Sequence, residues 1–367
     1  MECFKNIWGS VDGQDVELYE LVNDRGMRVR VMTYGATLIG VYVPDKEGKV
    51  QNVTLHLDTL EDYAAGHPFF GSVPGRYANR IRAGRFKLDG VEYHLAVNNG
   101  PNHLHGGIRG FDKYVWSAKT WYDSDSAAVE MSMRSPDGDE GYPGTLDVKV
   151  IYELTNKNEL FMRYFAQTDK ATVVNLTNHA YWNLHGCENP ENELRPVENI
   201  MDHELQLCAD NYLPTDADAL VTGEILPVVG TIMDFTSPRK IGSMLEGITD
   251  GSAPEGAGYD HCYVVRKKDA EEEGFPGLSC AARVYEEKSG RVMTVYTTYP
   301  GVQLYTANYV SGLKGSHYIW NRWSGFCLET QNFPDSPNQV EFPCTVLRPG
   351  EVYQHTSVFC FGVNKSF

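Results

Sequence analysis

Apolar and polar residues alternate with a period of two along much of this 367-residue chain. The clearest runs span residues 91–97, 146–151 and 293–297. A period of two places successive side chains on opposite faces of an extended segment, as in half-buried antiparallel strands. Turn-forming Asp, Asn and Gly residues separate such runs, at 23–26, 45–48, 89–90 and 137–141. The pattern predicts an all-β chain of antiparallel strands joined by short turns.

Very little helix is expected. The best candidate follows Thr59, which can cap a helix with Asp62 three residues later and Gly66 at its end. This segment is long enough for one or two turns. The 12% aromatic residues, with 35 Gly and 18 Pro, likewise favour short strands and turns over long helices.

No repeat, low-complexity tract or clear linker divides the chain. Residues 185–215 are polar and poorly periodic, and we interpret them as a long excursion with local structure. Residues 266–274 are rich in charge and predict a solvated hairpin tip. We therefore expect residues 1–367 to form one large β domain.

The chain carries 32 Lys and Arg against 49 Asp and Glu, a net charge of −17. Such a surface repels phosphate backbones and anionic membranes, which argues against nucleic-acid or membrane partners. It mildly favours a neutral substrate, although a role in solubility alone explains the charge equally well.

Eight cysteines occur without a C-x-x-C pair, so zinc-ribbon and thioredoxin-type sites are not indicated. Several lie in apolar runs, and we expect reduced thiols in a cytoplasmic protein. The N-terminal residues lack the apolar region of a signal peptide, and no run of 18 apolar residues predicts a membrane span.

Two distant blocks are too polar for plain core strands. Residues 175–184 place His179 among amide and hydroxyl side chains, and residues 329–338 begin with Glu329 at the end of an apolar strand. A carboxylate on an apolar strand is costly unless it is paired or faces a cleft. If folding brings the two together, they can act as a general acid and a general base on a small polar substrate.

Residues 75–86 contain four arginines and one asparagine. Alternation would place Arg76, Arg80 and Arg82 on one face of a strand and Asn79 on the other. Arginine beside asparagine offers fixed donors for sugar hydroxyls. A solvated strand edge is the plainer interpretation, and phosphate binding is a third, although no glycine-rich phosphate loop accompanies the segment.

Three further patterns remain ambiguous. His103 and His105 form a His-x-His pair that permits a metal, although hydrogen bonding to a substrate is favoured by the glycines that follow. Asp260 beside His261 is either a catalytic pair or an ordinary strand start. Gln303 shares a strand face with a tyrosine, as in carbohydrate grooves and in edge strands. Neither a G-x-S-x-G nor an H-E-x-x-H motif occurs, so serine hydrolases and zincins lack support.

Taken together, the blocks resemble the aldose 1-epimerase family, the galactose mutarotases, nearly from end to end. The matching blocks are Tyr34–Leu38, Val43–Asp45, Gly75–Ile81, Asn98–Asn102, Leu104–Gly107, Gly110–Lys113, Asp139–Gly144, Asn175–His179, Gly258–His261, Glu329–Gln331 and Arg348–Glu351. Near the matched blocks, Ala180, Trp182 and Cys262 depart from the residues that are frequent in the family, which affects substrate preference rather than the reaction.

The resemblance implies a single large antiparallel β-sandwich, called a supersandwich, with sugar bound in a cleft across one sheet. It implies interconversion of the α and β anomers of free hexoses such as D-galactose and D-glucose, without a cofactor or a metal. His179 stands at the position of the general acid and Glu329 at that of the general base. The positions that hold sugar hydroxyls are Asn79, Arg80, His105, Asp260 and Gln303. The expected partner is a monosaccharide, and the expected protein is a monomer or homodimer.

Two alternatives remain open. A related epimerase acting on a hexose 6-phosphate would show extra basic residues at the cleft rim. A catalytically silent sugar-binding β-sandwich would bind sugar without exchanging anomers. The sequence does not decide whether His103 and His261 are structural or contact substrate.

Overall fold

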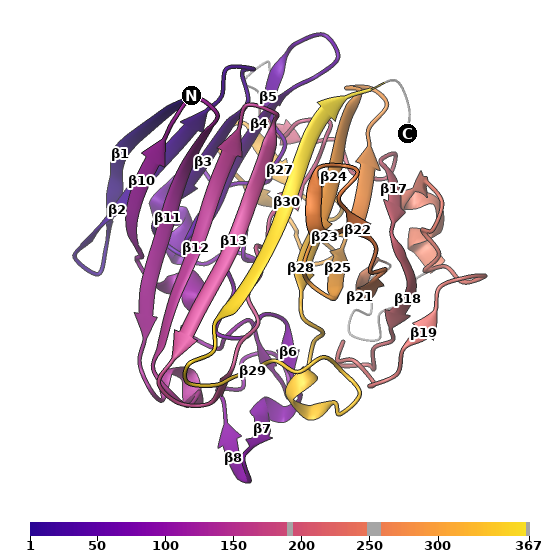
Figure 1. Ribbon diagram of the computed structural model, residues 1–367. Coiled ribbons are helices and arrows are strands. Elements are labelled where there is room, and N and C mark those ends of the chain that lie inside the picture. The colour runs from indigo at the N-terminus through magenta and orange to yellow at the C-terminus, as the bar shows by residue number, and fades with distance from the viewer. Residues whose placement is uncertain (189–193, 248–257, 365–367) are drawn as a thin grey trace.

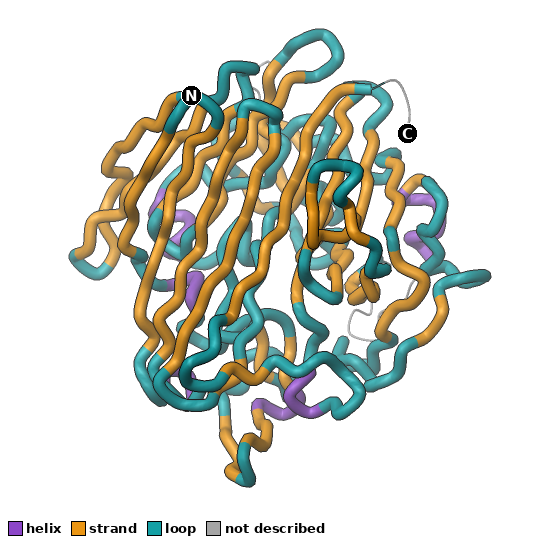
Figure 2. The backbone as a smooth tube through the Cα atoms, viewed as in Figure 1, coloured by secondary structure: helices purple, strands orange, loops and turns teal. Residues whose placement is uncertain are grey.

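The computed structural model describes residues 1–188, 194–247 and 258–364, and strands dominate these residues (Figures 1 and 2). This confirms the all-β prediction. Within the described residues, the largest sheet has ten strands and faces the viewer in Figure 1. Its order is β10 (Ser117–Tyr122), β11 (Ser126–Ser135), β12 (Leu146–Thr155), β13 (Glu159–Thr168), β30 (Tyr353–Val363), β24 (Arg291–Thr297), β23 (Phe275–Tyr285), β17 (Glu204–Leu207) and β20 (Arg239–Lys240), with β22 (Asp269–Ala270) paired to β23.

A six-stranded sheet carries the candidate site, and its neighbouring strands are antiparallel. Its order is β15 (Tyr181–Trp182), β28 (Phe326–Gln331), β25 (Gly301–Tyr305), β21 (Asp260–Val265), β18 (Ala209–Leu213) and β19 (Leu226–Pro227). A five-stranded sheet at the N-terminus contains β1 (Glu2–Val11), β2 (Gln14–Val22), β3 (Arg28–Met32), β4 (Thr37–Pro44) and β5 (Val50–Asn52) in chain order.

Short strands and turns complete the described structure. The small sheets are β6 (Arg80–Ile81) with β9 (His103–Leu104), β7 (Arg85–Leu88) with β8 (Val91–His94), β14 (Thr172–Val173) with β29 (Val346–Leu347), and β16 (Arg195–Pro196) with β27 (Tyr318–Trp320) and β26 (Leu313–Lys314). The helical segments are α1 (Leu60–Ala65) and the 3₁₀ turns η1 (Arg82–Gly84), η2 (Phe111–Lys113), η3 (Asp139–Gly141), η4 (Ile241–Gly247) and η5 (Ser336–Asn338).

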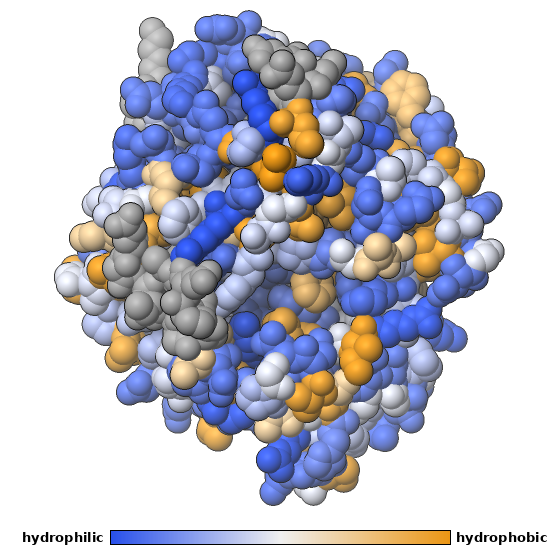
Figure 3. Space-filling model, turned by 180° about the vertical axis from the view of Figure 1, so that it is seen from behind, coloured by the Kyte–Doolittle hydropathy of each residue, from blue (hydrophilic) through white to orange (hydrophobic). Residues whose placement is uncertain are grey.

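One large apolar core joins the three main sheets. It includes Leu38 from β4, Tyr152 from β12 and Leu328 from β28, all at most 2% exposed. Apolar faces of separate sheets can leave water only by packing on one another, which gives the sandwich its layers. The opposite side of the molecule shows a largely hydrophilic surface with small scattered hydrophobic areas (Figure 3).

The alternation in residues 146–151 is confirmed by β12. Leu146, Val148 and Val150 are buried, whereas Asp147 and Lys149 are exposed. The same pattern in residues 91–97 predicted that Val91 and Val97 lie on a buried face, which is wrong, because they are 53% and 50% exposed. Strand β8 pairs with β7 in a projecting hairpin (Figure 1), whose buried side is formed by Phe86 and Leu88 on β7 and by Leu95, and not by Val91.

The predicted helix is confirmed as α1, with the Thr59 hydroxyl accepting a hydrogen bond from the Asp62 amide. The excursion at 185–215 contains β16, β17 and β18, so it is more regular than expected, while residues 189–193 within it lie outside the described residues. No helix in the described ranges is long and apolar enough to cross a membrane.

Candidate active site

Strand alternation builds the floor of a cavity on the six-stranded sheet. On β28, Phe326 and Leu328 pack into the large core, so Cys327 and Glu329 project from the other face. Cross-strand register then aligns Glu329 with Gln303 on β25. The neighbouring row aligns Cys327 with Tyr305 on β25 and with Tyr181 on β15.

The two polar blocks of the sequence are hydrogen-bonded to each other. The Thr177 hydroxyl donates to the Thr330 carbonyl at 2.9 Å. The Asn175 side chain accepts from the Asn332 amide at 2.9 Å and donates to the Asn332 carbonyl at 3.3 Å. These amide and hydroxyl groups are therefore the ties that hold the segment of His179 beside the strand of Glu329.

His179 and Glu329 meet in the cavity, as the sequence predicted. The His179 Nε2 and Glu329 Oε1 atoms are 3.7 Å apart, and the residues are only 5% and 2% exposed. Burial lowers the pKa of His179 to about 4, so its imidazole is neutral at pH 7. Burial, with the nearby Asp260 carboxylate, raises the pKa of Glu329 well above its usual range, and Arg80 opposes this shift.

Four of the remaining predicted residues, Asn79, Arg80, His105 and Asp260, line the same cavity. The Arg80 guanidinium lies 3.8 Å from the Asp260 carboxylate and donates to the Asn99 side chain at 3.1 Å. The Gln303 amide donates to Asp260 at 2.7 Å. Gln303 is not among the residues that line the cavity, so its link to the site is this hydrogen bond to Asp260.

Asn79 and His105 both have positive φ angles, 63° and 52°. This backbone conformation lets the Asn79 amide donate to His105 Nδ1 at 3.1 Å, while the Asn79 side chain accepts from the Arg80 amide. The backbone of Gly106 packs closely against that of Gly75: a Cβ at residue 106 would lie 1.6 Å from the Gly75 carbonyl oxygen, so only glycine fits there.

The tautomer of His105 follows from this contact. Burial and neighbouring cationic groups hold the pKa of His105 well below 6.5, so the ring is neutral. Because Nδ1 accepts a backbone N–H, the ring proton is on Nε2, which can only donate. Ligand atoms of His105, His179 and Glu329 lie within 4.8 Å of one another, as a metal site would require. A protonated Nε2 is not a metal ligand, so the donor set does not fit a cation.

His103 points away from the cavity. Its Nδ1 contacts the Ala96 carbonyl at 2.7 Å and its Nε2 contacts the Tyr142 hydroxyl at 2.6 Å, in a fully buried position. The Nδ1 of His261 accepts from the Asp260 amide at 3.2 Å, and His261 does not line the cavity. In the structure, both histidines support backbone and side-chain packing.

The cavity has a volume of about 340 Å³. Its lining residues are Pro68, Phe69, Asn79, Arg80, Asn99, Leu104, His105, His179, Tyr181, Asp218, Asp260, Tyr305, Tyr309 and Glu329. Two aromatic rings lie nearly parallel to the His179 imidazole: Phe69 at 5.8 Å and 18°, and Tyr181 at 5.0 Å and 19°. Strand periodicity could have predicted that Tyr181, two residues after His179, lies on the same face as His179. No local feature of the sequence predicts that Phe69 lies beside the His179 ring.

The prediction that Arg76, Arg80 and Arg82 share one strand face is wrong. Only Arg80 and the residue after it form a strand, β6, because positive φ angles at Asn79 and Ala83 interrupt the extended chain. Arg76 is buried and donates to the Pro143 and Gly144 carbonyls. Arg82 is exposed, 3.5 Å from Asp216.

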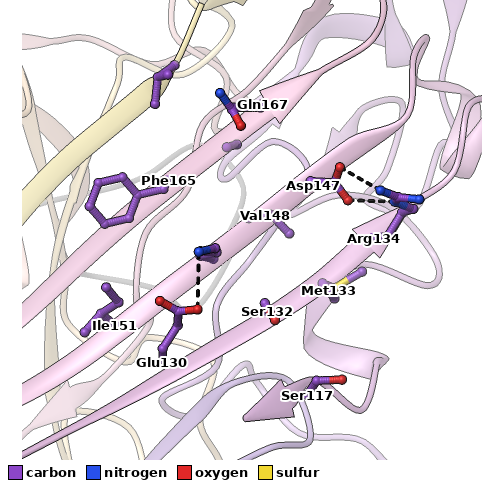
Figure 4. Close-up of a pocket in the computed structure, with 13 residues that line it drawn as sticks. Ser117, Glu130, Ser132, Met133, Arg134, Asp147, Val148, Ile151, Phe165 and Gln167 are labelled. Carbon is purple, nitrogen blue, oxygen red and sulfur yellow. Dashed lines mark hydrogen bonds and ion pairs between the residues drawn. The ribbon is translucent and has the colours of Figure 1, made fainter. Parts of the chain in front are cut away.

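A larger concavity, of about 690 Å³, lies on the outer face of the ten-stranded sheet. Its charged side chains are paired with one another: Arg134 with Asp147, as Figure 4 shows, and Glu130 with Lys149. These are ordinary cross-strand ion pairs on a solvent-facing sheet. We therefore assign the chemistry to the smaller cavity, which His179 and Glu329 line.

The fold and the cavity together define a β-sandwich enzyme with a buried imidazole and a buried carboxyl group facing one small cavity of mixed polar and aromatic lining. Comparisons of the sequence with known proteins all point to one family. The aldose 1-epimerase family model matches residues 17–360. Human galactose mutarotase is 46% identical over 353 residues, which cover 96% of this chain and 95% of that protein. The aldose 1-epimerase of Escherichia coli is 36% identical, covering 95% and 96% of the two chains.

Solved structures agree. The galactose 1-epimerase of Lactobacillus acidophilus superimposes with a TM-score of 0.83 at 30% identity, covering 99% of both chains. An aldose epimerase homologue from Caenorhabditis elegans gives 0.81 at 30% identity, covering 94% of this chain and 98% of the other. The chain belongs to the aldose 1-epimerase family, and it is therefore an isomerase.

Proposed function

We propose that this protein interconverts the α and β anomers of free hexoses, with D-galactose and D-glucose as substrates. The observation that carries the proposal is the distance of 3.7 Å between His179 Nε2 and Glu329 Oε1, both buried side chains that line one cavity. The names of the relatives support the reaction, since they include galactose mutarotases and an aldose 1-epimerase.

Opening a cyclic hemiacetal removes a proton from the C1 hydroxyl and adds one to the ring oxygen. Glu329 takes the first proton as general base, and His179 gives the second as general acid. The C1–C2 bond of the open aldehyde then rotates. The ring closes from the other face as Glu329 returns its proton to C1 oxygen and His179 recovers its own, so no cofactor is consumed.

The raised pKa of Glu329 suits this role, because a weaker acid leaves a stronger conjugate base. His179 acts from its neutral form: it gives its Nε2 proton to the ring oxygen, is left as an imidazolate while the aldehyde is open, and takes the proton back as the ring closes. Arg80 and His105 donate to sugar oxygens, and Asn79 and Asp260 complete the hydroxyl contacts, with Gln303 holding Asp260 in place.

A free sugar fits the charges of the cavity better than a sugar phosphate. Among the described residues that line the cavity, Arg80 is the single Lys or Arg, and it faces the Asp260 carboxylate. Asp218 and Glu329 add further acidic groups to the lining. A phosphate dianion would meet net repulsion there.

We propose a monomeric or homodimeric protein in the cytoplasm, where the eight free cysteines would stay reduced.

Polarimetry of freshly dissolved α-D-galactose and α-D-glucose, with and without protein, tests the proposal. Faster decay to the unchanged final rotation is expected for both sugars. Inhibition of that decay by glucose 6-phosphate at low concentration would favour the phosphate-specific alternative. Sugar binding without faster decay would identify a silent binding protein instead.

A further inference from the structure

The proposed acid, His179, has a second contact that the reaction scheme leaves unused. Its Nδ1 atom lies 3.5 Å from the sulfur of Cys327, on the ring edge away from the Glu329 contact made by Nε2. Cys327 is fully buried, as is the whole of this interaction. A thiol–imidazole contact at this distance is within the range of a hydrogen bond involving sulfur.

A neutral imidazole carries one proton, on either Nδ1 or Nε2. The acid role requires that proton on Nε2, since Nε2 faces the cavity. The Cys327 thiol keeps its own hydrogen, because burial and the nearby Glu329 carboxylate raise its pKa well above 9. A thiol that retains its hydrogen can donate it to an unprotonated Nδ1.

We propose that Cys327 is a positioning residue, whose S–H donates to His179 Nδ1 and thereby fixes the ring proton on Nε2. This inference rests on the proposed role of His179 as the acid. Cys327 itself does not touch the substrate or exchange a proton with it.

The neighbouring histidine uses the same device with a different donor. The Asn79 backbone N–H donates to His105 Nδ1, which leaves the His105 proton on Nε2. Both imidazoles then present Nε2–H groups to the cavity. A backbone amide can hold His105 because the chain turns there, whereas the group facing Nδ1 of His179 from β28 is the Cys327 side chain.

Strand geometry explains why residue 327 supplies that side chain. Cys327 and Glu329 are two residues apart on β28, so they project from the same face about two strand rises from each other. Cross-strand pairing places Cys327 opposite Tyr181 on β15, two residues after His179. One strand therefore carries both the proposed base and the group that orients the proposed acid.

The test compares Cys327→Val, which keeps the volume without a donor, with Cys327→Ser, which keeps a donor. Cys327→Ala is a second donor-free variant in case valine disturbs packing. Cys187→Ala is the matched control, because Cys187 is a fully buried cysteine of the same apolar cluster as Cys327. Nitrogen NMR of protein labelled in histidine reports directly which ring nitrogen carries the proton, with His179→Gln identifying the signals.

In the wild type and the Cys187→Ala control, His179 should show a protonated Nε2 and an unprotonated Nδ1. In Cys327→Val and Cys327→Ala the two nitrogen shifts should move toward each other as the tautomers mix. Loss of one weak hydrogen bond should lower kcat about tenfold with KM nearly unchanged, and serine should restore most of it.

Two results would overturn the inference: a wild-type His179 protonated on Nδ1, or an unchanged Nε2–H pattern in both donor-free variants. The NMR result is independent of turnover. Tautomer mixing in a protein that does not accelerate mutarotation would keep the Cys327 contact and reject the proposed function.

Discussion

Glu329 and His179 share one buried cavity, yet burial moves their pKa values in opposite directions. Burial penalises the charged form of each group, so it raises the pKa of the carboxyl group and lowers that of the imidazole. Burial therefore disfavours an ion pair between the two groups. Glu329 acts as the base in the molecules in which its carboxyl group is ionised, while His179 stays neutral.

Glu329→Gln should lower kcat by about 10²–10⁴-fold, because the amide cannot accept the C1 proton while its shape still fits the cavity. KM for galactose should change little. Initial polarimetric rates over a range of sugar concentrations measure both constants. Glu130→Gln, on the outer sheet face, is the matched control and should behave as the wild type. A near-normal rate for Glu329→Gln would reject Glu329 as the base.

The pH profile gives a second test at the residue scale. Glu329 must be ionised to act as base, so kcat/KM is lost as pH falls through its raised pKa. The acid limb should thus lie above pH 4.5. The pKa of His179 is about 4, so the imidazole stays neutral above that value and should add no alkaline limb near 6.5. Rates corrected for spontaneous mutarotation measure the profile. An alkaline limb near 6.5 would instead identify an imidazolium acid.

At the scale of elements, periodicity predicted those parts of the site that lie on regular strands. Glu329 stood out because its strand is otherwise apolar, and the same period of two leads to Cys327 on β28. The prediction failed for residues 75–86, where positive φ angles at Asn79 and Ala83 break the strand. Phe69 could not be predicted, since its contact with His179 joins residues 110 positions apart and depends on tertiary packing.

The tie between the two polar blocks should be measurable. Thr177→Val removes the hydroxyl that donates to the Thr330 carbonyl and leaves that buried acceptor without this donor. The free energy of unfolding should fall by about 1–3 kcal/mol. Urea unfolding followed by fluorescence measures the change, with Thr177→Ser as the control that keeps the hydroxyl. Equal stability of the valine variant and the wild type would show that the tie contributes nothing.

At the scale of the whole molecule, the sheets are joined within the chain as well as by packing. Leu207 ends β17 in the ten-stranded sheet and Ala209 begins β18 in the six-stranded sheet, so a single residue, Cys208, lies between them. The large core includes both Leu207 and Ala209. We propose that the described parts of the chain fold as one domain, in keeping with the absence of a linker in the sequence.

Unfolding in urea should accordingly follow one transition. Far-ultraviolet circular dichroism, near-ultraviolet circular dichroism and mutarotase activity should share one midpoint, because no sheet can lose its partner without exposing the common core. Galactose should shift all three midpoints together. Two separated midpoints would instead show that part of the molecule unfolds alone.

The proposed acid and base are both held by strands and their immediate flanks, one of them in the middle of a packed sheet. Inversion at C1 requires that the ring close on the opposite face of the C1 carbonyl. Because the acid and the base are fixed in the fold, the C1 carbonyl of the open sugar must rotate relative to them. A cavity for this reaction has to hold the end of the sugar away from C1 and leave room for rotation about the C1–C2 bond. A sugar whose ring cannot open should therefore bind well but remain a single anomer.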